Sequence, residues 1–265
     1  MPLFDASKFT AAKAKPLPVI LLLDNSVSMA TDNNIGKLNQ AVKKMLASLV
    51  AEENQNTEFL VSVITFGREG AKLLQAPTSA ANVELADLTI ADHGNDGTPL
   101  GAALDEASNL IDATHGTFAP VVVLVSDGEP NDDHWSSKLE KFISEGRTAK
   151  CDRMALAIGA SAISGRGRPA LDHFVKGTER EVKTAENASE IRDFFRYVTM
   201  SVVARSNSQN PNQIPSDNVV AATQLNPTAT PPTKPYEAAP EANGAFGELG
   251  LPVNDDDDDF DYSPY

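Results

Sequence analysis

Cysteine, positive charge and long apolar segments are scarce in this sequence, and each shortage excludes a class of protein. The 265 residues include a single cysteine, Cys151, so no disulfide can form within the chain, as is usual in a reducing compartment. The formal net charge of −15 argues against a basic face that binds nucleic acid. The apolar run that follows Lys8, Lys13 and Lys15 is too short for a signal peptide or a membrane span. We therefore expect a cytoplasmic protein with no membrane or nucleic-acid partner and with Cys151 as an inert, buried thiol.

Motifs of the common enzyme classes are also missing. The sequence has no G-x-x-x-x-G-K-[S/T] phosphate loop, no G-x-G-x-x-G after a strand and no G-x-S-x-G nucleophile elbow. Ser26 or Ser28 would need a neighbouring base to act as a nucleophile, and nothing in the sequence marks any of the four histidines as that base. We therefore expect a protein that is not an enzyme.

The composition of the chain changes after Arg205. Residues 206–265 hold nine of the 17 prolines, ten Asp or Glu against one Lys, and the unbroken acidic run from Asp255 to Asp259. Such a segment cannot bury enough apolar surface to offset the entropy lost on ordering. We predict three parts: an N-terminal extension (1–16), a folded domain (17–205) and a disordered, proline-rich and acidic tail (206–265).

Apolar runs alternate with helical patterns throughout the folded part. Runs at 19–23 and 121–125 are apolar at every position, which is typical of strands buried on both faces of a parallel sheet. Glycines 67 and 70 separate two further strands, which predicts an antiparallel hairpin at one edge. Helical spacing recurs at 35–49, 100–111, 135–144 and 187–202, and Asn187 caps the last of these helices, with Glu190 three residues on. We predict a doubly wound α/β fold, mostly parallel, with one antiparallel edge strand and helices on both faces.

The first buried strand ends in a polar loop with the pattern D-x-S-x-S. Asp24, Ser26 and Ser28 alternate along this loop, so their oxygens can converge on one point. A carboxylate and two hydroxyls form a hard oxygen set that suits Mg²⁺, Mn²⁺ or Ca²⁺ rather than zinc. The same residues also suit a polar turn that caps a helix, so this motif alone leaves both interpretations open.

Two other segments lead to the same edge of the predicted sheet. Thr98 stands at the start of a helix, and Asp127 directly follows the second apolar strand. Binding crevices of doubly wound sheets lie at the carboxyl ends of the strands, so these two residues are predicted to join the Asp24 loop. Taken separately, Thr98 could cap its helix and Asp127 could serve a turn. Nearby, Asp132 could shape the rim of the site, although we expect it in a solvated turn. Farther on, Arg168 belongs to a small basic segment that could hold phosphate, although we expect a flexible surface loop.

Together these residues resemble the metal-ion-dependent adhesion site of von Willebrand factor A domains. The family pattern of D-x-S-x-S, then Thr, then Asp is matched by the five residues Asp24, Ser26, Ser28, Thr98 and Asp127. The resemblance spans roughly residues 17–204, which makes 17–205 the A domain. It extends to bacterial TerY-like proteins of tellurite-resistance clusters, whose L-x-[S/T]-D-G-x-P-x-D-x-W segment is similar to Leu124–Trp135, with one extra residue before the tryptophan.

The resemblance implies a metal site that binds a partner. Ser26 and Ser28 would bind the ion directly, Thr98 directly or through water, and Asp24 and Asp127 mainly through water. One open position would accept an Asp or Glu of a protein partner. Mg²⁺ is the expected ion, with Mn²⁺ or Ca²⁺ as alternatives. The implied function is protein interaction in a bacterial stress-response complex; the alternatives are a metal-dependent hydrolase or phosphatase and an accessory subunit of an AAA+ ATPase.

The tail adds two hypotheses. TerY-like proteins are encoded beside a kinase and a phosphatase, so these enzymes would act on tail residues near proline, namely Thr228, Thr230, Thr233 and Ser263. The tethered run from Asp255 to Asp259 would also compete for the open position of the metal.

Overall fold

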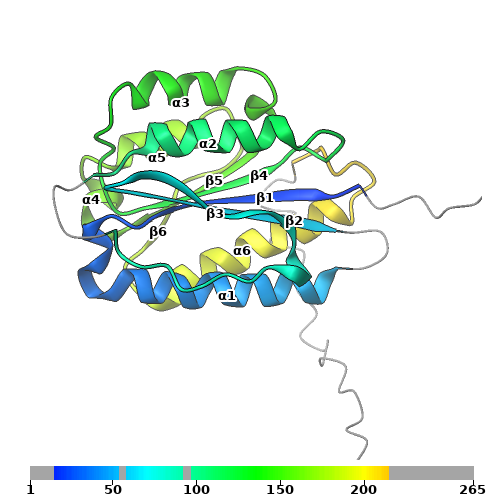
Figure 1. Cartoon of the computed structure of the whole chain (residues 1–265), viewed down its shortest axis with the longest axis horizontal. Helices are drawn as coiled ribbons and strands as arrows, with labels where there is room; N and C mark the ends of the chain where they lie inside the picture. The colour runs from blue at the N-terminus through cyan, green and yellow to red at the C-terminus, as the bar shows by residue number, and fades with distance from the viewer. Residues whose placement is uncertain (1–14, 54–57, 92–96, 215–265) are drawn as a thin grey trace, which may run out of the picture. The chain divides into compact units, whose positions relative to one another are not determined.

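The computed structural model describes residues 15–53, 58–91 and 97–214, which form a six-stranded sheet between two layers of helices (Figure 1). The strands lie in the order β3-β2-β1-β4-β5-β6. The β2–β3 pair is antiparallel and the other pairs are parallel, which confirms the predicted fold class. The strands are β1 (Leu17–Asp24), β2 (Phe59–Gly67), β3 (Gly70–Ser79), β4 (Val121–Ser126), β5 (Asp152–Ile158) and β6 (Lys183–Ala185).

The two apolar runs form neighbouring central strands. Every residue of β1 and β4 is buried, and the strands pair in parallel with Leu23 opposite Val125. Alternate residues of β1 therefore enter two separate cores: Leu21 packs into the core below the sheet and Leu22 into the core above it. Because both strands run the same way, Asp24 and Ser126 end at the same edge of the sheet.

Helices cover both faces of the sheet. In Figure 1, α1 (Asn34–Glu52) and α6 (Ala188–Ser206) lie below it, and α2 (Leu100–Ala113), α3 (Trp135–Ser144) and α5 (Arg168–Val175) lie above it. Three short 3₁₀ helices and α4 complete the described elements: Val27–Asn33, Ala80–Asn82, Thr148–Lys150 and α4 (Gly159–Ser164). The predicted cap of the last helix is confirmed, because the Asn187 side chain accepts hydrogen bonds from the backbone N–H groups of Ser189 and Glu190.

The structure corrects the expectation for the segment after β5. Arg168 is the first residue of α5 and not part of a flexible loop. Its guanidinium donates hydrogen bonds to Asp172 Oδ1 (2.8 Å) and to the carbonyl oxygen of Ile163 (3.2 Å). Pro169 stands in the first turn, where its missing N–H costs no hydrogen bond. Both α4 and α5 are too short for their apolar periodicity to be distinguished from a loop.

A buried ionic group lies at the opposite edge of the sheet, where β5 begins. The Asp152 carboxylate accepts hydrogen bonds from Arg180 Nε (3.0 Å) and Nη2 (2.9 Å). Arg205, at the end of α6, lies 3.9 Å from the same carboxylate and donates to the carbonyl oxygens of Ala119 and Pro211. These contacts connect the end of α6 to the sheet. Residues 1–14 of the predicted N-terminal extension (1–16) and residues 215–265 of the predicted tail (206–265) lie outside the described residues.

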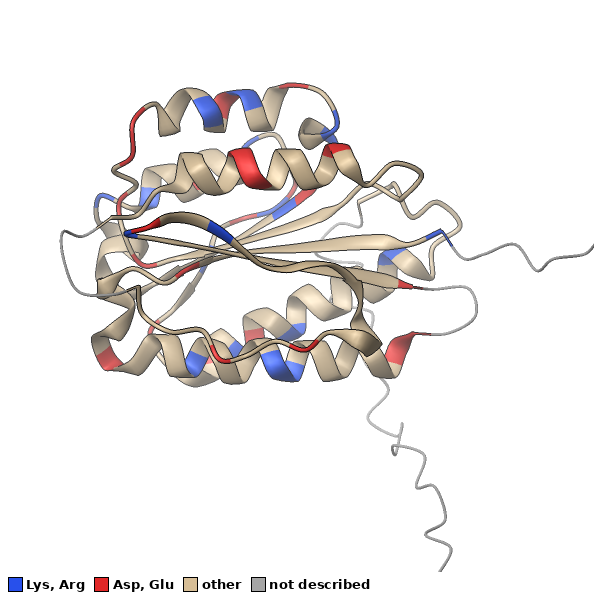
Figure 2. Cartoon of the chain, viewed as in Figure 1, with Lys and Arg blue, Asp and Glu red and all other residues tan. Residues whose placement is uncertain are grey.

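The central strands carry few charged residues. In Figure 2 the ribbon positions coloured as Lys, Arg, Asp or Glu fall mainly on the helices and loops. None of the described helices has the length and apolar character needed to cross a membrane. Cys151 is buried at the start of β5, and its burial raises the pKa of the thiol to about 12, which agrees with the inert thiol expected from the sequence.

Candidate metal site

Asp24 is fixed at the carboxyl end of β1 by hydrogen bonds to both oxygens of its carboxylate. Oδ1 accepts from the backbone N–H of Ser26 (2.9 Å), and Oδ2 accepts from the hydroxyl of Ser126 on β4 (2.6 Å). The residue is fully buried, and this burial raises the pKa of the carboxyl group, while the hydrogen bonds from Ser126 and Ser26 lower it. A buried carboxylate held in this way can balance the charge of a nearby cation.

The two loop serines connect Asp24 to Asp127. The hydroxyl oxygens of Ser26 and Ser28 are 2.9 Å apart, and the Ser28 hydroxyl donates to Asp127 Oδ1 at 2.6 Å. Ser26 is buried and Ser28 is exposed, so the group opens to solvent at Ser28. The structure therefore brings four of the five predicted residues into one hydrogen-bonded group.

Thr98 reaches the same place from the start of α2. A Cβ atom on Gly128 would stand 3.1 Å from Thr98 Oγ1 and 3.9 Å from Ser28 Oγ, which locates both hydroxyls beside this glycine. Thr98 does not cap α2, because Pro99 is the N-cap residue and no side chain of the cap position bonds to the helix. Among the described residues, the Thr98 hydroxyl makes no hydrogen bond, although Thr98 is only 6% exposed. The hydroxyl is not one of the fully buried, unpartnered side-chain atoms of the described chain, so solvent or a ligand can reach it.

The distance between the two serine hydroxyl oxygens, which is that of a hydrogen bond, is also compatible with two ligands of one cation. Ligands at adjacent corners of an octahedron around Mg²⁺, with bonds near 2.1 Å, lie about 3.0 Å apart, and the Ser26 and Ser28 hydroxyl oxygens are 2.9 Å apart. Within residues 15–53, 58–91 and 97–214, no group of three or more His, Cys, Asp or Glu side chains is placed to hold a metal. The predicted donors at this place are three hydroxyls and two carboxylates, those of Ser26, Ser28, Thr98, Asp24 and Asp127.

Asp132 lies half-buried in the bend before α3, and its carboxylate bonds to the protein backbone, which the expected solvated turn did not include. Its Oδ1 accepts from the backbone N–H of Gly101 (3.1 Å) and its Oδ2 from that of Ala102 (3.0 Å). The preceding residue, Asn131, pairs with Thr98: Thr98 N–H donates to Asn131 Oδ1 (2.8 Å), and Asn131 N–H donates to the Thr98 carbonyl oxygen (3.3 Å). The sequence marks Asp132 only as a polar residue after a strand, so its partners could not be predicted.

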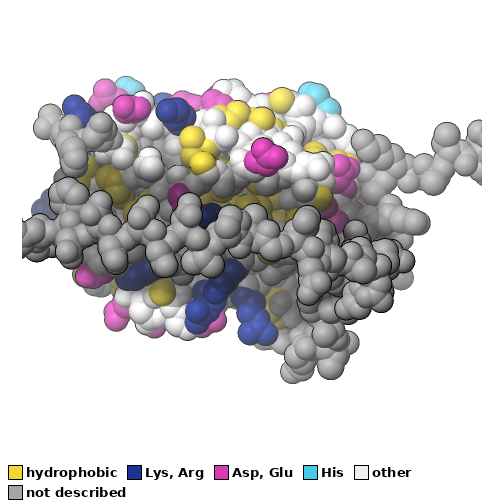
Figure 3. All heavy atoms as spheres, turned by 60° about the horizontal axis from the view of Figure 1, so that its bottom comes forward, with side chains coloured by type: hydrophobic (Ala, Val, Ile, Leu, Met, Phe, Trp, Pro, Cys, Tyr) yellow, Lys and Arg dark blue, Asp and Glu magenta, His cyan; other side chains and the backbone are white. Residues whose placement is uncertain are grey.

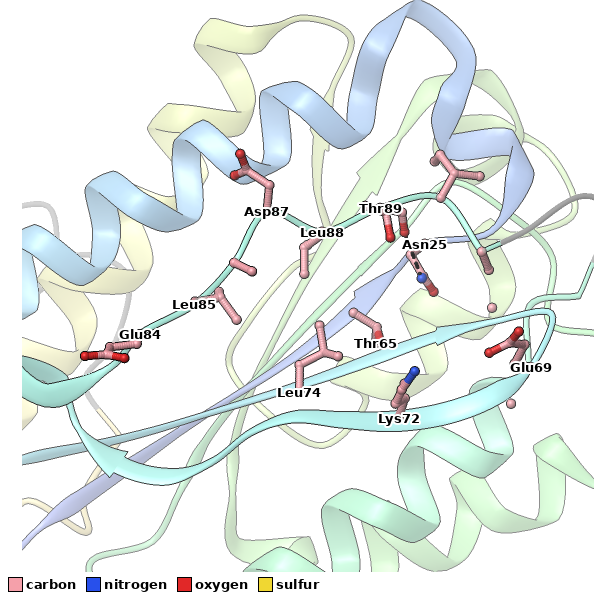
Figure 4. A pocket seen from close by; sticks show the side chains of 15 residues that line it. Asn25, Thr65, Glu69, Lys72, Leu74, Glu84, Leu85, Asp87, Leu88 and Thr89 are labelled. Carbon is pink, nitrogen blue, oxygen red and sulfur yellow. Dashed lines mark hydrogen bonds between the residues drawn. The ribbon is translucent and has the colours of Figure 1, made fainter.

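A groove of about 480 Å³ adjoins the Asp24 loop (Figure 4). It lies between strand β3 and the extended segment 83–91, and Asn25 lines it at the site. The Asn25 side chain donates to the Thr89 carbonyl oxygen (3.0 Å), and the Asn25 carbonyl oxygen accepts from Ala91 N–H (2.9 Å). A Cβ on Gly67 would stand only 2.6 Å from Asn25 Oδ1, so a larger residue there would displace the Asn25 side chain. A partner that reaches the site would meet this groove next.

A second groove, of about 250 Å³, lies between α1 and α6 and is lined by none of the five predicted site residues. Phe195 and Met45 contribute apolar lining, and Lys44, Arg192 and Arg196 contribute positive charge. Figure 3, which brings the α1 and α6 layer forward, shows Lys and Arg side chains gathered on this face. The groove is therefore a feature separate from the Asp24 loop.

Comparison with known proteins supports the family resemblance. Residues 19–129 match the family model of the von Willebrand factor type A domain, and this segment contains all five predicted site residues. No curated protein matches the sequence. Neither finding points to the TerY-like group in particular.

Solved structures show the same fold at low sequence identity. Proximal thread matrix protein 1 from the mussel byssus, in a structure described as having a zinc-occupied MIDAS motif, is 18% identical, with a TM-score of 0.54 over 72% of this chain and 48% of that chain. The pilus adhesin SpaC from Lactobacillus rhamnosus GG, in its open conformation, is 15% identical, with a TM-score of 0.56 over 72% of this chain and 30% of that chain. The chain thus spans less than half the length of either protein and has the von Willebrand factor A fold.

Proposed function

We propose that this protein is a cation-dependent interaction module that binds a carboxylate of a protein partner at the Asp24 loop. The observation that carries the proposal is the hydrogen-bonded group of Ser26, Ser28 and Asp127, with the Thr98 hydroxyl beside it. The Thr98 hydroxyl does not cap α2 and makes no hydrogen bond among the described residues, so it stays open to a ligand. A divalent cation would take it as one.

The donor set explains why a partner would be attracted. A bound divalent cation supplies a concentrated positive charge at the mouth of the site. Asp24 already accepts two hydrogen bonds and Asp127 accepts one from Ser28, so we propose that both carboxylates face the cation largely through the serines or water. With few direct anionic ligands, much of the positive charge remains to attract an external Asp or Glu. Ser28 is exposed and gives that carboxylate access.

We propose Mg²⁺ as the resident ion because hydroxyl and carboxylate oxygens are hard ligands. Zinc is the ion named for the mussel protein, so zinc belongs among the ions to be tested. We also propose that the protein is not an enzyme. Metal-dependent hydrolases and phosphatases usually collect several direct carboxylates, and no group of three acidic or other typical metal-binding side chains is found within the described part of the chain.

The biological setting follows only from the sequence motifs. The segment from Leu124 to Trp135 is similar to that of TerY-like proteins, and on this basis we place the module in a bacterial stress-response complex in the cytoplasm. An accessory role beside an AAA+ ATPase remains the alternative, and a partner with ATPase activity would identify it.

The test is cation binding by the full-length protein, measured by isothermal titration calorimetry with Mg²⁺, Mn²⁺ and Zn²⁺ in turn. Asp24→Ala removes the residue that connects Ser26 with Ser126 and is expected to abolish binding. Asp133→Ala is the matched control, since it removes the same charge from an exposed residue after the Asp127 loop. Partner capture with and without EDTA then tests the interaction itself. A wild-type protein that binds none of the three ions, or an Asp24→Ala variant that binds as the control does, would contradict the proposal.

A further inference from the structure

The two loops that carry Thr98 and Asp127 are held together by four hydrogen bonds. Two of them join Thr98 and Asn131 in both directions, and two join the Asp132 carboxylate to the backbone N–H groups of Gly101 and Ala102. Asn131 and Asp132 therefore connect the start of α2 to the loop that leaves β4. We call these two residues the Asn131–Asp132 clamp.

The start of α2 depends on this clamp because it has no cap of its own. The first N–H groups of a helix have no partner within the helix, and the positive end of the helix dipole favours an anion there. Pro99 offers no side-chain acceptor at the N-cap position. The Asp132 carboxylate supplies both the acceptors and the negative charge, although it is 31 residues away from Gly101 in the sequence.

Close packing leaves little freedom at this junction. A Cβ atom on Gly101 would stand 2.7 Å from Asp132 Oδ2 and 2.9 Å from the Cα atom of Trp135. These distances are shorter than any side chain tolerates, so only glycine allows α2 and the start of α3 to approach this closely. Thr98 lies only three residues before Gly101 in the chain.

We propose that the Asn131–Asp132 clamp positions the Thr98 hydroxyl for cation binding, so that cation affinity depends on Asp132 although Asp132 is not a ligand. This inference rests on the proposed function. Both Asp132 oxygens are occupied by α2 backbone groups, so its effect on the cation passes through Thr98. Asp132 is thus a positioning residue for the site.

The test compares cation affinities of the full-length protein and three variants by calorimetry. Asp132→Ala removes both acceptors, and loss of a group that orients a ligand typically weakens metal binding by about 10–100-fold. Asp132→Asn keeps one acceptor in nearly the same place and is expected to restore part of that affinity. Asp133→Ala, which changes the charge equally at the neighbouring exposed position, is expected to bind as the wild type does.

A second measurement examines the clamp without any cation. Amide hydrogen exchange at Gly101 and Ala102 is expected to quicken in Asp132→Ala and to stay unchanged in Asp133→Ala, because only the first change removes their acceptor. If Asp132→Ala does not fold, Asp132→Asn and its exchange rates decide the question. An affinity of Asp132→Ala within twofold of the Asp133→Ala value overturns the inference while the proposed function stands. A wild-type protein without cation affinity, but with Gly101 exchange controlled by Asp132, overturns the proposed function instead.

Discussion

Removing the Asp152 carboxylate is expected to destabilise the protein far more than removing an exposed acid. Asp152 is fully buried and is the anion of a group that contains two buried guanidinium groups, those of Arg180 and Arg205. In Asp152→Ala, Arg180 loses hydrogen bonds of 3.0 and 2.9 Å. Arg205 loses its nearby negative charge, and its Nη1 atom already lacks a hydrogen bond among the described residues. Two buried guanidinium groups would then lose the carboxylate that lies between them.

The size of the effect follows from the cost of such isolated charges. Breaking a buried ion pair by removing one partner costs about 3–5 kcal/mol, chiefly through the uncompensated charge that stays behind. For a domain of this size, each kcal/mol lowers the melting temperature by about 2–4 °C, so we expect a drop of roughly 6–20 °C. The control is Asp87→Ala, which removes an ion pair with Lys43 in which both side chains are more than half exposed. Exposed pairs contribute about 0–1 kcal/mol.

The assay is urea unfolding of the two variants and the wild type, followed by circular dichroism, with thermal melting as a second measure. The free energy of unfolding should fall by about 3–5 kcal/mol in Asp152→Ala and by about 0–1 kcal/mol in Asp87→Ala. The two losses should therefore differ by about 2 kcal/mol or more. If Asp152→Ala and Asp87→Ala lower the free energy of unfolding equally, the buried group contributes no more than a surface pair, and the reasoning is refuted.

Three further predictions concern the site and its supports. Burial raises the pKa of the Asp24 carboxyl, so the folded state disfavours the ionised form of this group at pH 7. Without metal, Asp24→Asn should therefore raise the urea midpoint of unfolding. This gain should shrink as the pH falls through the folded-state pKa of Asp24, because the wild-type carboxyl then becomes neutral too. A lowered midpoint at pH 7 would contradict this. Gly67→Ala forces a methyl group within 2.6 Å of Asn25 Oδ1 and should cost about 1–3 kcal/mol in unfolding free energy; no change would show that Asn25 moves freely. Asn187→Ala removes both cap hydrogen bonds of α6 and should cost about 1 kcal/mol by the same assay, while Asn187→Asp should retain most of it.

The fold was predictable because its central strands are apolar at every position. Residues 19–23 and 121–125 can be buried on both faces only in the middle of a layered sheet, and β1 and β4 lie there. The hairpin of β2 and β3 was marked by its glycines. Helices α4 and α5 were not foreseen, because six or eight residues carry too few apolar positions to show a helical period.

The candidate site was predictable in its residues but not in its supports. Asp24, Ser26 and Ser28 follow a strand that ends at a known edge, so their meeting with Asp127 follows from topology. The contacts of Asp132 with Gly101 and of Ser126 with Asp24 depend on distances between loops, which no pattern of residue types records. The same is true of the buried arginines, which a sequence would assign to the surface. Whether the five residues bind a cation stays a prediction.

The buried state of Cys151 makes the native protein suitable for site-directed labelling. Burial raises the pKa of this thiol well above that of an ordinary exposed cysteine, so a far smaller fraction of it is the reactive thiolate near neutral pH. A maleimide probe would therefore leave Cys151 unmodified and react with a cysteine introduced on the surface. Single spin labels or fluorophores placed beside the two grooves would then report on a bound partner without replacement of the natural thiol.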